Sequence, residues 1–229
     1  MVRQPANLFL NLLFPVVLTV VFTFVFSDPE LGMSIDTVIP GLVVYAVIFL
    51  IMTTAQSFSS EKQAGLLKRL NTTPMTAGEF LGSRLITHML IAMAQVIIVL
   101  SLAVALGFQP ASGAIGILVA LPVAAVFSLS TVGLGLITAT ASRTPEVATG
   151  MSFVFILPQM FFGTYIPITR VTQQVAALMP SYYLREALML IFDGHWTNPA
   201  ILVNVSVIAA VSVTVVALGT QLFEKLGKA

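Results

Sequence analysis

Cysteine is absent from this chain of 229 residues, and charged residues are scarce. Without cysteine there is no disulfide framework and no thiol chemistry. Asp, Glu, Lys and Arg make up 8 % of the residues, roughly a third of their share in a soluble domain. The net charge of +1 argues against nucleic acid as a partner, because such binding needs a dense basic surface. Since 58 % of the residues are hydrophobic, the composition indicates an integral membrane protein.

Residues of the kind that carry catalysis are few. His88 could serve as a proton or substrate relay within the membrane, or as an interfacial anchor that hydrogen-bonds a neighbouring helix. Asp193 and His195 offer two potential metal ligands, which do not make a metal site, and Trp196 beside them is typical of an interfacial anchor. No phosphate-binding loop occurs, so we expect no ATP hydrolysis by that route. We also expect neither a metal nor a cofactor in this chain.

Long apolar runs dominate the sequence. A membrane-spanning helix needs about 20 apolar residues. Six runs satisfy this, at about residues 8–26, 39–58, 85–106, 115–139, 147–166 and 200–223. Residues that favour turns separate them, as in Arg143-Thr144-Pro145-Glu146. We therefore predict an all-α integral membrane protein with one transmembrane domain over residues 1–229.

The basic residues predict how the spans are oriented. If the N-terminus is cytoplasmic, eight of the ten basic residues are inside: Arg3, Lys62, Lys68, Arg69, Arg84, Arg143, Lys225 and Lys228. Arg170 and Arg185 remain outside. Because cytoplasmic loops are enriched in Lys and Arg, we expect a multi-pass protein of the cell membrane with both termini in the cytoplasm.

Residues 61–70 form a charged segment between the second and third spans. On a helical projection one face holds Ala64, Leu67 and Leu70, with Leu66 beside it. The other face holds Glu61, Lys62, Lys68 and Arg69. Such a helix could insert into a cleft of a partner protein or lie on the membrane surface, and its residues leave both interpretations open.

Residues 167–194 are too apolar for a free outer loop, yet they are interrupted by Pro180 and four charges. Two short helices that dip into the outer leaflet and break at Pro180 would satisfy both facts. Backbone that enters the membrane without spanning it must pack against protein or water. We therefore predict a re-entrant helix pair before the last span.

A resemblance to a known family begins with the run Glu61-Lys62-Gln63-Ala64-Gly65-Leu66-Leu67-Lys68-Arg69-Leu70-Asn71-Thr72-Thr73-Pro74. It resembles the segment between the second and third spans of type-2 ATP-binding-cassette (ABC) exporter permeases. A second similarity lies in Met179-Pro180-Ser181-Tyr182-Tyr183-Leu184-Arg185-Glu186-Ala187-Leu188, and a third in Pro158-Gln159-Met160-Phe161-Phe162-Gly163 with Ile166-Pro167. These are similar to the signature after the fifth span and to the interrupted fifth span. The resemblance covers nearly the whole chain and is of the daunorubicin/multidrug-resistance type.

The resemblance implies that residues 61–70 are a coupling helix that docks into a separate ATPase. Polar contacts with the ATPase would come from Glu61, Lys68 and Arg69; Leu66, Leu67 and Leu70 would fill its groove, and Gly65 would allow close approach. The re-entrant signature maps to Pro180, Tyr182, Arg185 and Glu186. The resemblance also implies an amphipathic interface helix before the first span, a position occupied in this sequence by Met1 to Ala6.

The partners implied by the resemblance are two copies of an ABC ATPase, which bind ATP and magnesium, and a second permease copy, identical or related. Aromatic residues of the second and fifth spans could line a path for a hydrophobic drug-like or lipid cargo, or simply pack: Tyr45, Phe49, Phe153, Phe161, Phe162 and Tyr165. Thr131, Gly135 and Ala139 form a stripe of small residues, suited either to packing within one subunit or to a dimer seam.

Two other functions stay open at this point. An ion-coupled secondary carrier would transport without any ATPase, although such carriers usually need charged groups within their spans, which this chain has only near the span ends. A non-transporting anchor would recruit an ATPase to the membrane, but six spans exceed what anchoring requires.

Overall fold

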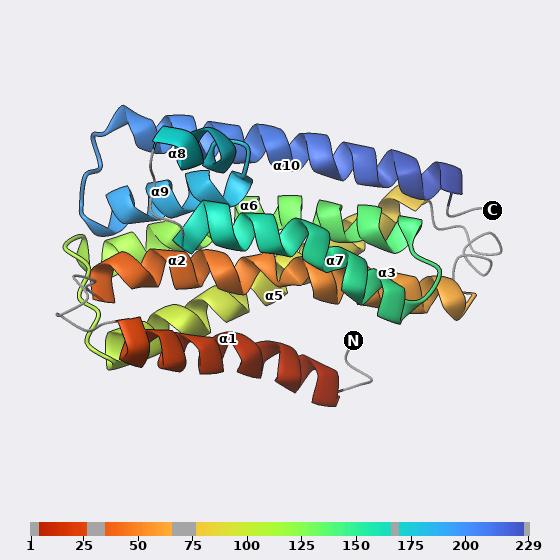
Figure 1. Cartoon of the computed structure of the whole chain (residues 1–229), viewed down its shortest axis with the longest axis horizontal. Coiled ribbons are helices and arrows are strands. Elements are labelled where there is room, and N and C mark those ends of the chain that lie inside the picture. The colour runs from red at the N-terminus through yellow and green to blue at the C-terminus, as the bar shows by residue number, and fades with distance from the viewer. Residues whose placement is uncertain (1–4, 27–34, 66–76, 166–169, 227–229) are drawn as a thin grey trace.

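The computed structural model describes residues 5–26, 35–65, 77–165 and 170–226, and every regular element in these residues is helical (Figure 1). The elements are α1 (Pro5–Phe26), α2 (Ile35–Ile48), α3 (Leu50–Gln63), α5 (Ala77–Ala105), α6 (Gly113–Ala141), α7 (Pro145–Met160), the π-helical turn η2 (Phe161–Tyr165), α8 (Arg170–Ala176), α9 (Pro180–Phe192) and α10 (Pro199–Leu226).

The long helices coincide with the predicted spans. Among the described residues, five stretches are long and apolar enough to cross a membrane: Ile35–Gln63, Leu81–Ala105, Gly113–Ala141, Pro145–Gly163 and Pro199–Phe223. The predicted first span corresponds to α1, in which the shorter segment Pro15–Val25 is apolar. The prediction of an all-α integral membrane protein is confirmed.

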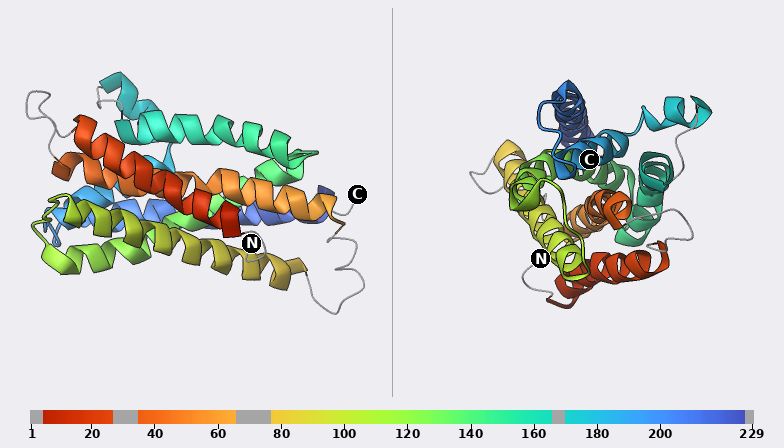
Figure 2. Two further views of the ribbon diagram at one scale, coloured as in Figure 1. Left: turned by 90° about the horizontal axis from the view of Figure 1, so that it is seen from below. Right: turned by 90° about the vertical axis from the view of Figure 1, so that its left-hand side faces the viewer.

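The predicted second span, residues 39–58, is formed by two helices in the structure. α2 ends at Ile48 and α3 begins at Leu50, and Phe49 joins them. The amide of Phe49 reaches the carbonyl of Tyr45 at 3.4 Å, so the helical hydrogen bonding is stretched at the junction. Together α2 and α3 run lengthwise through the bundle, and α1, α5, α6, α7 and α9 all contact α2 (Figure 2).

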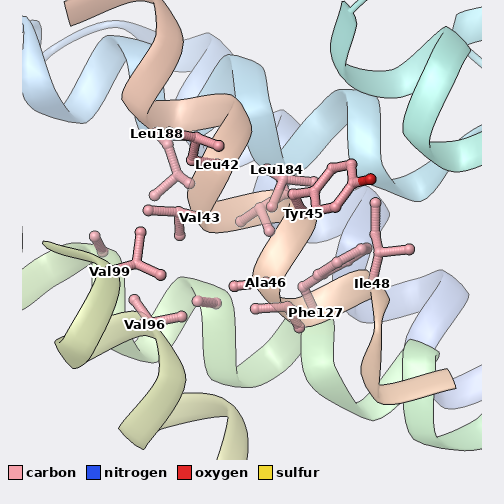
Figure 3. Packing of buried hydrophobic residues seen from close by; sticks show 14 of the residues in the cluster. Leu42, Val43, Tyr45, Ala46, Ile48, Val96, Val99, Phe127, Leu184 and Leu188 are labelled. Atoms are coloured by element: carbon pink, nitrogen blue, oxygen red, sulfur yellow. The ribbon is translucent and has the colours of Figure 1, made fainter. Parts of the chain in front are cut away.

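The core of the molecule surrounds α2. Figure 3 shows Leu42, Val43 and Ala46 of α2 packed among side chains of α5, α6 and α9: Val96, Val99, Phe127, Leu184 and Leu188. The most apolar window of α2 and α3 is 94 % buried, whereas the corresponding window of α10 is 11 % buried. Because lipid tails are as apolar as these side chains, α10 can leave Leu202 and Val213 exposed without the cost that water would impose.

The fifth predicted span, residues 147–166, changes from α-helix to π-helix near its end. α7 begins at Pro145, where the hydroxyl of Thr144 accepts a hydrogen bond from the amide of Val147 at 3.3 Å. Pro158 inside α7 has no amide proton, which removes one hydrogen bond of the helix. The chain then continues as η2 instead of an α-helix.

Opposite ends of the bundle collect different elements. The end of α3, the start of α5 and the end of α10 lie at one end, and α1 starts short of that end (Figure 1). The α5–α6 connection, α8 and α9 lie at the other end, where the amide of Ser112 donates to the carbonyl of Phe192 at 3.0 Å. We call the first of these the Glu61 end, after the charged residue that α3 carries there.

Candidate functional site

The predicted coupling segment, residues 61–70, begins on a membrane-spanning helix. Glu61, Lys62 and Gln63 form the last turn of α3, and Ala64 and Gly65 form a turn. Leu66, Leu67, Lys68, Arg69 and Leu70 lie outside the described residues. The structure therefore describes only the first half of the predicted coupling segment.

The end of α3 corrects the prediction of one uninterrupted helix over residues 61–70. Gly65 has φ +68°, a left-handed conformation that residues with a Cβ rarely adopt, and its amide donates to the carbonyl of Lys62 at 3.1 Å. A helix cannot continue through that conformation. Close approach of Gly65 to a partner stays a prediction, and in the structure this glycine directly follows the end of α3.

Glu61 forms an ion pair with Arg84, which lies about two turns into α5. The relative exposures of the two side chains are 19 % and 22 %, so both are largely sheltered from solvent. Sheltered charges are screened less by salt than exposed ones, which strengthens their attraction. The pair joins α3 to α5 on the two sides of residues 66–76.

The last turn of α3 also contacts the connection between α6 and α7. The Nζ atom of Lys62 donates to the carbonyl of Thr140 at 3.4 Å, and the Nε2 atom of Gln63 donates to the carbonyl of Arg143 at 3.3 Å. Thr140 is in the last turn of α6, where backbone carbonyls lack helical partners and a cation is favourable. The last turn of α3 is thus held against the end of α6 and against the turn that leads into α7.

Apolar side chains fill the space next to this polar layer. Phe58 of α3 stacks on the ring of His88 at a centroid distance of 6.3 Å and meets Phe223 of α10 edge-on at 6.2 Å. Leu81, Leu136 and Ala139 complete the cluster. Three elements that are distant in sequence therefore converge on Phe58.

His88 lies inside this cluster with no exposed surface. Its Nδ1 atom is 2.9 Å from the carbonyl of Arg84, so we assign the proton to Nδ1. Its Nε2 atom meets no hydrogen-bond partner among the described residues. The described contacts match neither the relay nor an interfacial anchor that bonds a neighbouring helix, because the ring is buried and its one hydrogen bond is to a carbonyl of its own helix.

The segment predicted as re-entrant holds α8 and α9, at the end of the bundle opposite Glu61 (Figure 1). Pro180 begins α9, and Tyr182 is partly buried. Arg185 and Glu186 pair with each other at 3.1 Å. The hydroxyl of Ser181 donates to the carbonyl of Gln159 at 3.0 Å, which ties α9 to α7.

The described aromatic residues of the predicted cargo path differ in burial. Tyr45 and Phe49 are buried in the core, with their ring centroids 4.9 Å apart. Phe153 and Phe161 are exposed on α7 and η2, and Phe162 is partly buried. The side chain of Tyr165 lies outside the described residues. The structure thus divides the described members of this set between the core and an outer face.

The small residues of α6 face the interior of the same subunit. A Cβ atom placed on Gly135 would come within 2.7 Å of the Cβ of Thr54 on α3. Thr131 and Ala139 are buried as well. The dimer-seam interpretation of this stripe is therefore wrong, and packing within one subunit explains it.

Arg84 is the functional candidate that the sequence reasoning missed. The signal was present, because Glu61 and Arg84 carry opposite charges at the ends of two consecutive spans on the same predicted side of the membrane.

The described residues also bear on metal binding. Within the described ranges no group of three or more His, Cys, Asp or Glu side chains could hold a metal ion.

Long apolar helices with their charged residues near the helix ends define this protein as a polytopic α-helical membrane protein. The chain belongs to the ABC-2 type transporter family, whose family model matches residues 1–192. It is similar to the daunorubicin resistance ABC transporter permease protein DrrB1 of Streptomyces coeruleorubidus, with 25 % identity over 167 residues. That alignment covers 69 % of this chain and 57 % of the relative, so the chain matches little more than half of that protein's length.

Proposed function

We propose that this chain is the transmembrane permease subunit of an ABC exporter, and that a separate nucleotide-binding subunit hydrolyses ATP for it. Two permease copies, identical or related, would form the translocation path, and two ATPase subunits would bind their cytoplasmic sides. ATP and magnesium would reside in the ATPase. The cargo is a hydrophobic drug-like compound or a lipid, in keeping with the resistance function named for the DrrB1 relative.

The observation that carries this proposal is the arrangement at the Glu61 end. Residues 66–76 connect α3 to α5, and the ion pair between Glu61 and Arg84 joins those two helices close to that connection. The leucines of the coupling motif belong to this connection. A partner that moved residues 66–70 would act directly on two spanning helices.

The distribution of charge favours ATP-driven transport over an ion-coupled carrier. In the described spans the acidic and basic residues stand near helix ends, as Asp36, Glu61, Arg84 and Glu146 do. Carriers that couple to protons or cations usually place such groups at mid-membrane. The energy for transport would therefore come from the partner ATPase, with both chain termini on its side of the membrane.

The test is ATPase activity and ATPase co-purification with the candidate ATPase co-expressed, in nanodiscs, for the wild type and Leu67→Asp. An aspartate in place of a groove-filling leucine would put a charge into an apolar contact, so we expect loss of association and of cargo-stimulated turnover. Leu178→Asp is the matched control, because Leu178 is 76 % exposed at the opposite end of the bundle, and it should retain both.

Each alternative function has its own outcome in this experiment. Transport driven by an ion gradient without any ATPase would replace the exporter with a secondary carrier. Recruitment of the ATPase without cargo stimulation or transport would instead support the non-transporting anchor. Retention of full association by Leu67→Asp would contradict the docking role of residues 66–70.

A further inference from the structure

Glu61 is engaged within its own subunit, although its motif suggested contact with the ATPase. Its carboxylate pairs with Arg84, and about four-fifths of the surface of each side chain is covered. A carboxylate placed in this way is a poor docking contact, because reaching a partner would require it to leave a sheltered cation. We therefore look for the role of Glu61 in the two helices, α3 and α5, that its ion pair joins.

The ion pair holds together the two helices between which residues 66–76 run. Glu61 lies two residues before Gln63, the last residue of α3, and Arg84 lies seven residues after the start of α5. The connection therefore begins within about one turn of the ion pair on α3, and it ends about two turns from the pair on α5. A force applied to residues 66–76 reaches α3 and α5 together while this bond is closed.

The neighbours of Glu61 extend the same connection to a third helix. Lys62 and Gln63 donate to backbone carbonyls at the end of α6 and in the turn that leads into α7. On the other side, the carbonyl of Arg84 is 2.9 Å from Nδ1 of His88, whose ring stacks on Phe58. The polar contacts of Glu61, Lys62 and Gln63 thus lie next to the packed apolar cluster around Phe58, which helps to hold these helix ends in place.

We propose that Glu61 and Arg84 are positioning residues that clamp α3 to α5 and pass the motion of the ATPase-bound connection into the spans. This inference rests on the proposed function, since the motion comes from the ATPase. It assigns Glu61 to transmission and leaves docking to residues 66–70. The clamp stays closed through the transport cycle, so that α3 and α5 move as one body.

The test uses Glu61→Arg, Arg84→Glu and the double variant that exchanges the two charges, each with the ATPase in nanodiscs. Each single reversal places like charges together, so cargo stimulation of ATPase activity should fall by about tenfold. ATPase co-purification should stay at the wild-type level. The exchanged pair should restore cargo stimulation, because it recreates the attraction with opposite polarity.

A covalent clamp provides a second measurement that does not depend on the charge variants. Since the chain has no cysteine, Glu61→Cys combined with Arg84→Cys offers two unique thiols for a short bifunctional thiol reagent, applied before the ATPase is added. The double cysteine variant should lose cargo stimulation, and cross-linking should restore it. Matched single cysteine variants treated in the same way should stay uncoupled.

Three outcomes would overturn the proposal, each in a recognisable way. Loss of ATPase association in Glu61→Arg without rescue by the exchanged pair would make Glu61 a docking residue. Restored thermal stability of the exchanged pair without restored coupling, together with an inactive cross-linked protein, would make the ion pair merely structural. Failure of the wild type itself to recruit an ATPase would instead overturn the proposed function, and this inference with it.

Discussion

Gly135 of α6 lies directly against Thr54 of α3, so closely that a methyl group at residue 135 has no room. A Cβ atom there would stand 2.7 Å from the Cβ of Thr54 and 2.8 Å from the backbone carbonyl oxygen of Ile51. Side chains this small allow two helices to approach until their backbones nearly touch. This contact links the most buried helix pair, α2 and α3, to α6.

Gly135→Ala should therefore destabilise the protein by about 1–3 kcal/mol, because α3 or α6 must shift to admit the methyl group. The same substitution at Gly150 is the control, since no atom lies within 4 Å of a Cβ placed there. Gly150→Ala should be neutral or stabilise α7 by up to about 1 kcal/mol. Unfolding titrations with a denaturing detergent would measure both, and equal stability of the two variants would refute the close contact.

Phe58→Ala should cost about 3 kcal/mol, because it leaves a cavity between α3, His88 of α5 and Phe223 of α10. Phe24→Ala is the matched control on α1, where the phenyl ring is 73 % exposed in the structure. Its removal should change the free energy of unfolding by less than about 0.5 kcal/mol. The same detergent titration applies, and a large loss in Phe24→Ala would point to a protein contact at that surface.

Ser181→Ala should destabilise the protein by about 1 kcal/mol through loss of the bond to the Gln159 carbonyl. Both residues are buried, so no water can replace the hydroxyl. Ser206→Ala on the exposed side of α10 should be neutral. Limited proteolysis near residues 176–180 would provide a second readout, since α9 should detach from α7 before the bundle unfolds. Unchanged proteolysis would contradict this role of the bond.

Single cysteines can establish the sides of the membrane, because the native chain has none. Leu178→Cys should react with a membrane-impermeant maleimide in intact cells. Gln63→Cys should react only after permeabilisation, if the basic residues orient the chain as predicted. Both positions are exposed. Ile48→Cys, which is fully buried, should stay unlabelled until the protein is denatured. Reversed labelling of the first two would overturn the predicted orientation.

The spans and their ends could be predicted from the sequence because apolar side chains favour lipid, whereas charged and polar side chains favour water. The turn predicted at residues 143–146 separates α6 from α7, and Pro180 begins α9. Breaks of this kind depend on nearby residues, since a proline or a capping threonine acts within one turn. The sequence did not predict the break at Phe49, because no proline or glycine marks the junction of α2 and α3.

The candidate site was only partly predictable, for a related reason. The charged motif drew attention to Glu61, but the motif could not name its partner, which is 23 residues away on another helix. The leucine and charge pattern also favoured a helix through Gly65, whereas the positive φ of this residue ends α3. Position along the chain says where a charge lies, and packing decides what it meets.

The sequence by itself determined that this is a helical membrane protein, since long apolar segments favour the bilayer and charged residues are costly away from the span ends. Its resemblance to the ABC-2 type came from the motifs at residues 61–74, 158–167 and 179–188. Only the tertiary structure decided that α2 and α3 are central, that the small residues of α6 face α3, and that Glu61 pairs with Arg84. The physical reason is that lipid and protein core are equally apolar. Hydrophobic pattern alone therefore cannot distinguish a face that meets lipid from one that meets another helix.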